Sequence, residues 1–187
     1  NTSDRSGHSN SLNKVVRPLT AKTNKTVKII ICIFLVVATF AIYSQVQDHE
    51  FLNYDDKQYV TDNLKVQAGL TRESVSWAFT TSHHATWFPM TWLSHILDYQ
   101  LYGSHPQGHL LTNVFFHIAS TLILFTVLLR MTGALWQSSF VAAMFALHPL
   151  NVESVAWVAQ RTNVLSTFFW LLTMWAYIRY VEKPNIK

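Results

Sequence analysis

"LLTNVFFHIASTLILFTVLL" (residues 110–129) is a run of apolar and small polar residues that contains no Asp, Glu, Lys or Arg. An α-helix needs about 17–25 mostly apolar residues to cross the hydrocarbon core of a bilayer. Only a helix or a closed barrel satisfies every backbone hydrogen bond inside hydrocarbon. The stretch therefore predicts a membrane-spanning helix.

Three further apolar runs flank this stretch. One begins with "IIICIFLVVATFAIY" and covers about 29–46, and the others cover 134–150 and 164–180. Each approaches the length that a crossing requires. The sequence predicts an all-α fold: a polytopic membrane helical bundle with four transmembrane helices and a long external loop at 47–109.

The composition supports a membrane protein. Half of the residues are hydrophobic and 13% are charged, against about 25% charged in an ordinary soluble domain. The net charge of +4 gathers in the polar tail 1–26, which indicates a topology signal rather than a nucleic-acid-binding arm. The single cysteine, Cys32, excludes a disulfide within the chain.

The external loop contains two helix signals. "GLTRESVSWAF" (69–79) starts with Thr71 as a cap, and "FPMTWLSHILDYQLYG" (88–103) starts at a proline and stops at a glycine. The second has an apolar stripe on one face and polar residues on another. We expect two short helices lying on the membrane surface.

Lys and Arg placement predicts the orientation. The basic tail, Arg130 and the basic residues after 178 alternate across successive spans, which places all of them on the cytoplasmic side. The loop 47–109 and the connector 151–163 then share the external face. We expect both ends of the chain to be cytoplasmic.

Asp55 and Asp56 are the first candidates for chemistry. A carboxylate close to a low-dielectric interface has its pKa tuned towards use as a general base, and a second carboxylate can orient it. The alternative is a solvated acidic turn. Arg161, just before the last span, suits a lipid phosphate; the alternatives are an interfacial anchor or a partner for Glu153.

Nine histidines raise the question of a metal site. His95 and Asp98 are three residues apart on one predicted helix, yet no zinc-binding spacing occurs. We expect no dedicated metal site, although a divalent cation stays open. Polar residues that share one face of the span at 110–129, among them Asn113, His117 and Ser120, are expected to make contacts between helices.

Several motifs in order resemble a known family. These are "YDDKQYV", "GLTRESVSWAFT", "WFPMTWLSHILDYQLYG", "PQGHLLTNVFFH" and "FALHPLNVESVAWVAQRTNVLSTFFWLLTMWAY". Together they resemble the N-terminal membrane part of transmembrane and tetratricopeptide-repeat proteins and their bacterial relatives, over about residues 28–184. That family is similar to GT-C type, protein O-mannosyltransferase-like glycosyltransferases.

The resemblance implies a GT-C-like transmembrane module at 27–184 and a chain that is the front portion of a longer protein, with later spans and a repeat domain absent. It implies transfer of a sugar from a polyprenyl-phosphate carrier to a protein or other hydroxyl acceptor, without a cofactor, on the external face of a bacterial inner membrane. It places the family's catalytic acidic motif on Asp55 and Asp56. On this basis we expect Arg161 to bind the lipid phosphate, and His95, Asp98 and Glu153 to be supporting residues.

Two other readings stay open. The chain could be a non-catalytic membrane anchor or assembly module of a repeat protein, or half of a transporter whose polar helix faces line a path. Acidic residues confined to the external surface favour the enzyme. An ionisable pair at mid-membrane would favour the transporter.

Overall fold

The computed structural model describes residues 25–52, 55–82 and 87–182, so nearly all of the predicted cytoplasmic tail lies outside the described residues. Within these ranges the regular structure is helical and no strand occurs. The helices are α2 Lys25–Tyr43, η1 Ser44–Asp48, η2 Lys57–Thr61, α3 Leu64–Gln67, α4 Arg72–Thr80, α5 Pro89–Tyr102, α6 Pro106–Thr132, α7 Leu135–Leu147, α8 Asn151–Val155, η3 Val158–Gln160 and α9 Arg161–Glu182.

Three helical segments are long and apolar enough to cross a membrane: Lys25–Asp48, Pro106–Thr132 and Val158–Glu182. They confirm an all-α membrane helical bundle and match three of the four predicted spans. The remaining predicted span, at 134–150, contains only the 13 residues of α7. At 1.5 Å per residue α7 is about 20 Å long, short of the roughly 30 Å of a hydrocarbon core. A crossing by α7 alone is not confirmed.

Proline explains why α7 ends early. His148 precedes Pro149 and has an extended backbone, with ψ at 130°, because the residue before a proline avoids the helical conformation. The chain then turns through α8 and η3 before α9 starts. The predicted span was too long because its last residues form this turn.

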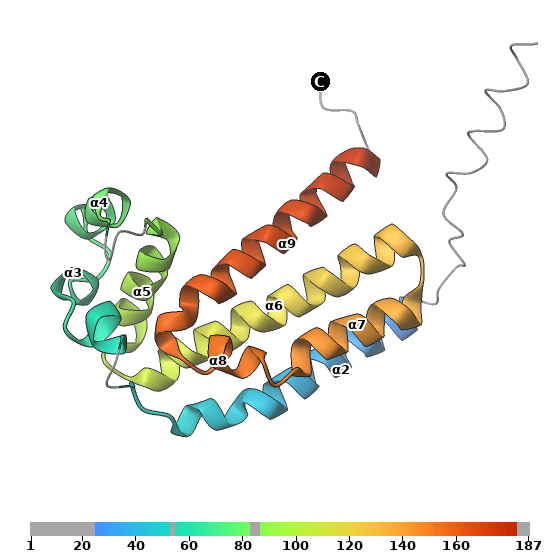
Figure 1. Cartoon of the computed structure of the whole chain (residues 1–187), viewed down its shortest axis with the longest axis horizontal. Helices are drawn as coiled ribbons and strands as arrows, with labels where there is room; N and C mark the ends of the chain where they lie inside the picture. Colours follow the sequence, from blue (N-terminus) through green and yellow to red (C-terminus); the bar gives the residue numbers. More distant parts are fainter. Residues whose placement is uncertain (1–24, 53–54, 83–86, 183–187) are drawn as a thin grey trace, which may run out of the picture.

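The chain nevertheless returns along the bundle (Figure 1). Leu135 of α7 packs near Phe125 of α6, and the α6 residue His117 contacts the carbonyl of Ala146. The helices α6 and α7 are therefore antiparallel. At the far end, Arg130 of α6 pairs with Glu182 of α9 at 2.6 Å. The ends of α6 and α9 lie together, as do their starts.

Two hydrophobic clusters hold the two ends of the bundle. One joins α2, α6 and α7 near the chain start and contains Leu35, Phe125, Leu135 and Ala142. The other joins the end of α2, η1 and η2 to the start of α6, α8 and η3 and contains Tyr43, Val46, Val60, Leu110, Val114, Val155 and Val158. A third cluster, Val66, Ala78, Trp92 and Ile96, packs the loop helices on one another.

The loop helices form where the sequence predicts them. The Thr71 hydroxyl accepts a hydrogen bond from the Ser74 N–H at 3.1 Å, and the Ser74 hydroxyl accepts one from the Thr71 N–H at 2.9 Å. This reciprocal cap satisfies two donors that a helix start leaves unpaired. Helix α5 begins at Pro89 and stops at Gly103, whose φ of 60° favours glycine.

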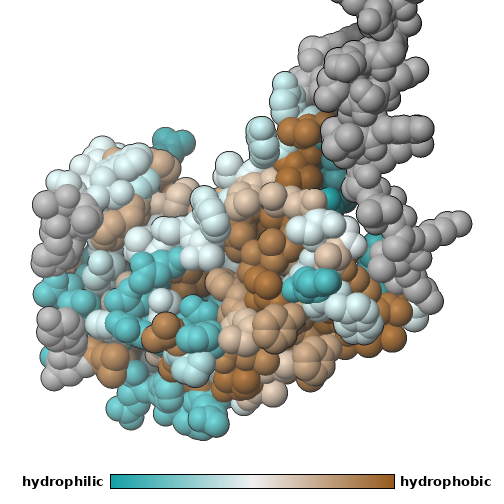
Figure 2. Space-filling model, turned by 45° about the vertical axis from the view of Figure 1, so that its right-hand side comes forward, coloured by the Kyte–Doolittle hydropathy of each residue, from teal (hydrophilic) through white to brown (hydrophobic). Residues whose placement is uncertain are grey.

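Helix α5 turns its polar face inward. Thr91, His95 and Asp98 are buried, whereas Leu97 is 44% and Leu101 is 62% exposed. The sequence predicts these two faces but not which of them meets the protein. In Figure 2, hydrophobic residues gather over the bundle and hydrophilic residues gather towards the end that carries the loop helices. An outward apolar face on α5 suits a helix that rests on lipid.

The predicted orientation gives a labelling test. Leu64, in the loop, is 78% exposed, and Met131, at the turn between α6 and α7, is 58% exposed. With Cys32 replaced by Ser, Leu64→Cys should react with a membrane-impermeant maleimide in intact cells, and Met131→Cys should react only after permeabilisation. Labelling of Met131→Cys alone in intact cells would reverse the orientation.

Candidate functional site

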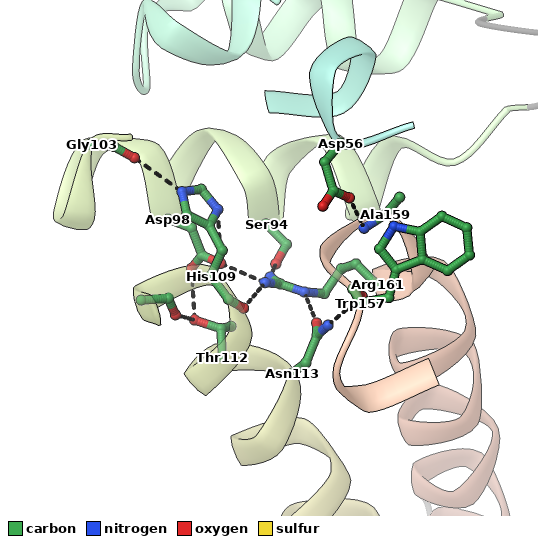
Figure 3. Close-up of polar contacts among 11 residues, drawn as sticks. Asp56, Ser94, Asp98, Gly103, His109, Thr112, Asn113, Trp157, Ala159 and Arg161 are labelled. Carbon is green, nitrogen blue, oxygen red and sulfur yellow. Dashed lines mark hydrogen bonds and ion pairs between the residues drawn. The ribbon is translucent and has the colours of Figure 1, made fainter. Parts of the chain in front are cut away.

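Arg161 forms the centre of a buried polar cluster at the end of the bundle that carries the loop helices. Its side chain has no exposed surface. It donates from Nη2 to Asp98 Oδ2 at 2.7 Å and to the His109 carbonyl at 2.6 Å. Nε bonds the Asn113 side-chain oxygen, and Nη1 bonds the Ser94 hydroxyl. Figure 3 shows the guanidinium enclosed by these groups.

The cluster ties three helices together. Arg161 starts α9, Ser94 and Asp98 belong to α5, and His109 and Asn113 belong to α6. A buried charge is tolerated only when it is paired and its remaining donors are satisfied. The other oxygen of Asp98 accepts a hydrogen bond from Thr112 at 3.0 Å, so both members of the ion pair are bonded on several sides.

Asp56 makes a second connection between distant segments of the chain. Its side chain is 1% exposed and accepts hydrogen bonds from the Leu52 N–H at 2.8 Å and the Ala159 N–H at 2.9 Å. Burial raises the pKa of this carboxyl, although the bonds from Leu52, Ala159 and the Trp157 side chain oppose that rise. Asp56 thereby joins the first loop to the segment that leads into Arg161.

Asp55 differs from its neighbour. It is partly exposed, and no described residue donates a hydrogen bond to its carboxylate. Its backbone carbonyl accepts from the N–H groups of Gln58 and Tyr59 at 3.0 and 3.1 Å, which starts η2. Of the two adjacent aspartates, Asp56 is the one whose carboxylate the described residues hold in place.

The supporting residues that the sequence predicts lie in different surroundings: His95 is buried and Glu153 is exposed. His95 is fully buried, with its ring edge towards Tyr59 at 5.9 Å and its centroid 6.3 Å from that of His109. Burial, followed by the charges of Arg161 and His109, lowers its pKa well below the usual value, so His95 is neutral. Glu153 is exposed on α8 and forms no hydrogen bond or ion pair with the described residues.

The structure thus brings Asp98 and His95 close to Arg161 and places Asp56 against Ala159, two residues before Arg161. It does not bring Glu153 into the cluster. Within 25–52, 55–82 and 87–182, no three His, Cys, Asp or Glu side chains gather as a set of metal ligands.

The sequence predicts a contact between helices at Asn113, and Asn113 makes one: it bonds Arg161 and donates to the Trp157 carbonyl at 2.9 Å. Its place in a charged cluster, and two further members of that cluster, were not predicted. Ser94 and Thr112 carried no signal, because isolated hydroxyl residues are common on helices. An amide and a histidine four residues apart at the start of an apolar span, Asn113 and His109, were the available signal.

An apolar groove borders the cluster. A volume of about 540 Å³ opens between α5, α6 and α9. Its apolar wall consists of Met90, Leu93, Leu97, Leu101, Leu111, Phe115, Phe116, Leu165 and Phe169. Ser94, Asp98 and Thr112 also line it, so two direct partners of Arg161 form its polar side. The groove combines an apolar cleft with hydrogen-bonding groups at one wall.

Fold and site together define a polytopic α-helical membrane protein with a charged cluster under a surface loop. The chain is similar to protein O-mannosyl-transferase Tmtc2 of Drosophila melanogaster, with 28% identity over 81% of this chain and 17% of the relative. It is also similar to human protein O-mannosyl-transferase TMTC4 (26% identity, 81% of this chain, 23% of the relative) and to Drosophila Tmtc1 (29%, 76% and 17%).

The resemblance drawn from the motifs is therefore confirmed: the chain is related to the TMTC-type, O-mannosyl-transferase-related membrane proteins. It spans 17–23% of the length of these three curated relatives. No family model matches the sequence, and no solved structure matches it.

The ion pair of Arg161 with Asp98 predicts strong coupling. Arg161→Leu should lower the free energy of unfolding by about 3–5 kcal/mol, because it leaves Asp98 as an unpaired buried charge. Asp98→Asn in the Arg161→Leu background should restore part of that loss. Thermal unfolding in detergent, arranged as a double-mutant cycle, measures the coupling. Additive losses would show that the two side chains do not act as a pair.

Asp56 predicts a pH effect of definite sign. Because burial raises its pKa in the folded chain, the folded state binds a proton more tightly than the unfolded state. Its contribution to stability is therefore full below the ordinary pKa of about 3.9 and falls as pH rises through the raised value. Melting temperatures of the parent chain and of Asp56→Asn are measured from about pH 3.9 upward. The parent should lose stability with rising pH more steeply than Asp56→Asn. Asp55→Asn is the control for losing one carboxylate.

Proposed function

We propose that the chain is the membrane part of a glycosyltransferase that moves a sugar from a polyprenyl-phosphate carrier to a hydroxyl group of a protein acceptor. The observation that carries this proposal is the groove between α5, α6 and α9, which has apolar walls and a polar side formed by Ser94, Asp98 and Thr112. A lipid-linked sugar has the same division between an apolar chain and a polar head.

The relatives support the reaction class, since each is named a protein O-mannosyl-transferase. We place the site on the external face of the membrane, in a bacterial inner membrane with the N-terminus cytoplasmic. The acceptor then approaches from water and the carrier from the outer leaflet. Both substrates meet where the surface loop covers the starts of α6 and α9.

The reaction is a displacement at the anomeric carbon of the sugar. The acceptor hydroxyl forms a new bond to that carbon while the bond from the carbon to the carrier phosphate breaks. A carboxylate takes the hydroxyl proton, and the bonding electrons leave with the phosphate. Developing negative charge on the phosphate requires nearby hydrogen-bond donors or a fixed cation.

Asp55 is our candidate for the general base, because its carboxylate is not held by described donors and is partly exposed. Asp56 is then a positioning residue. Its two oxygens hold Leu52 and Ala159, which fixes the backbone next to Asp55. The sequence does not show which of the adjacent aspartates is the base. This assignment makes Asp55 the base and Asp56 the residue that positions it.

Arg161 is our candidate for the cation that faces the leaving phosphate. It lies directly behind Ser94 and Asp98, which line the groove. A direct contact requires the phosphate to replace Asp98 at Nη2, so Asp98 competes with the carrier for the guanidinium. His95 packs beside His109 of the cluster as a neutral, buried ring. The proposed chemistry uses no cofactor.

A non-catalytic membrane anchor is the second candidate. The complete internal bonding of Arg161 favours it, because a guanidinium that serves four protein groups already has a structural role. The two proposals differ in carrier binding. An anchor has no need for selective binding of a polyprenyl phosphate beside α5.

A binding experiment separates them. The chain in lipid nanodiscs is incubated with a photoreactive polyprenyl phosphate, irradiated and digested. Crosslinks should map to α5 and α6 around Leu97 and Phe115 and should be competed by unlabelled polyprenyl phosphate but not by excess phospholipid. Leu97→Trp should reduce the yield about tenfold, equivalent to about 1.4 kcal/mol of binding.

Val141→Trp is the matched control, because Val141 is 46% exposed on α7 and lies outside the groove. Equal yields from the two variants, or full competition by phospholipid, would leave the anchor as the better reading. Folding of each variant is checked by its elution as a single species on size exclusion.

Sugar transfer by a chain that includes this module gives a second test. Asp55→Asn should lower the rate by about 100-fold or more, the usual loss for a general base, with an unchanged melting temperature. Asp56→Asn should lower melting temperature and rate together. Transfer in the presence of EDTA should match the untreated rate. An Asp55→Asn variant with parental activity would remove Asp55 from the mechanism.

A further inference from the structure

A polar cavity lies inside the bundle, apart from the Arg161 cluster. It is bounded by α6, α8 and α9 and has a volume of about 50 Å³. Six of its lining side chains are polar: His117, Ser120, Asn151, Ser154, Asn163 and Thr167. Val155 and Val164 complete the wall. Such a lining is unusual between helices that cross a membrane.

Ser120 shows that the cavity needs a polar occupant. Its residue is 1% exposed, and its hydroxyl has no hydrogen-bond partner among the described residues. A buried hydroxyl without a partner costs about 1–3 kcal/mol. Ser120 also lies near the middle of the membrane-spanning helix α6, Pro106–Thr132, where lipid offers no hydrogen bond.

The early end of α7 explains the polar wall. The last carbonyl groups of a helix have no partner within it. His117 contacts the Ala146 carbonyl at 3.0 Å, and the Asn151 amide donates to the Phe145 carbonyl at 2.6 Å. These side chains cap α7 and at the same time line the cavity. The short α7 therefore brings polar groups into the bundle.

The cavity also reaches towards the outer end of the bundle. Asn151 and Ser154 belong to α8, and Asn163 is exposed in the first turn of α9. Since α8 lies between the end of α7 and the start of α9, this polar lining runs from the exposed Asn163 inward to the buried Ser120.

We propose that this cavity is a water-binding site that hydrates the bundle to about half the depth of α6. A buried water needs room for about one water-sized sphere and two to four polar partners, and the cavity and its six polar side chains meet both needs. Ser120 supplies a hydroxyl to the innermost water. The site takes small uncharged polar molecules, because no described Asp, Glu, Lys or Arg lines it. It does not depend on the proposed sugar transfer.

Cysteine accessibility tests the proposal. In a Cys32→Ser background, Ser120→Cys is reconstituted in nanodiscs and exposed to Ag⁺, which is small, confined to water and reactive with thiolates. Thiols that remain free are then counted with a fluorescent maleimide in denaturant. A thiol in water ionises and reacts, whereas a thiol in apolar surroundings stays protonated. Ser120→Cys should be blocked at least about tenfold faster than Ala119→Cys, the neighbouring position outside the cavity lining.

A second substitution checks the route. Ser154→Leu, combined with Ser120→Cys, fills the outer part of the cavity and should slow the Ag⁺ reaction towards that of Ala119→Cys. If Ser120→Cys does not elute as a folded species, Thr167→Cys probes the same cavity from α9. Equal rates at the cavity position and at Ala119→Cys would show a dry cavity and overturn the proposal.

Discussion

The buried guanidinium of Arg161 is the constraint on which the half of the structure that carries the loop helices depends. It has no contact with solvent, so every donor must find a protein acceptor. Two acceptors are on α5 and two on α6, which fixes the loop helix across the start of the bundle. To present Ser94 and Asp98 to Arg161, α5 must turn its polar face inward. Its leucines then face outward and form one wall of the groove.

Asp56 extends the same constraint to the first loop. Its bond to Ala159 spans 103 residues of sequence and ends two residues before Arg161, so the loop and the start of α9 are positioned together. This arrangement gives the two adjacent aspartates different surroundings. Under the proposed function, a carboxylate that already accepts two backbone N–H groups is a poorer base for a substrate hydroxyl than its partly exposed neighbour.

The sequence predicts most of the fold, because length and hydropathy decide whether a helix can cross a bilayer, and caps decide where short helices begin. It overestimates the third apolar run, where a proline after His148 ends the helix although the residues stay apolar. The cluster is less predictable. Charge placement put Arg161 at the membrane surface, but its burial depends on partners 48 to 67 residues away, and a single sequence does not show which polar residues meet.

Helix α6 shows how one polar face serves several purposes. Asn113 accepts from Arg161 and donates to the Trp157 carbonyl, His117 contacts the end of α7, and Ser120 faces the cavity. Asn113 and His117 lie where a neighbouring helix starts or stops and leaves backbone groups unpaired. In a low-dielectric interior, these groups are stable only when they meet each other or water. The polar face of α6 is therefore a consequence of the breaks in its neighbours, and those breaks bring both the charged cluster and the polar cavity into an otherwise apolar bundle.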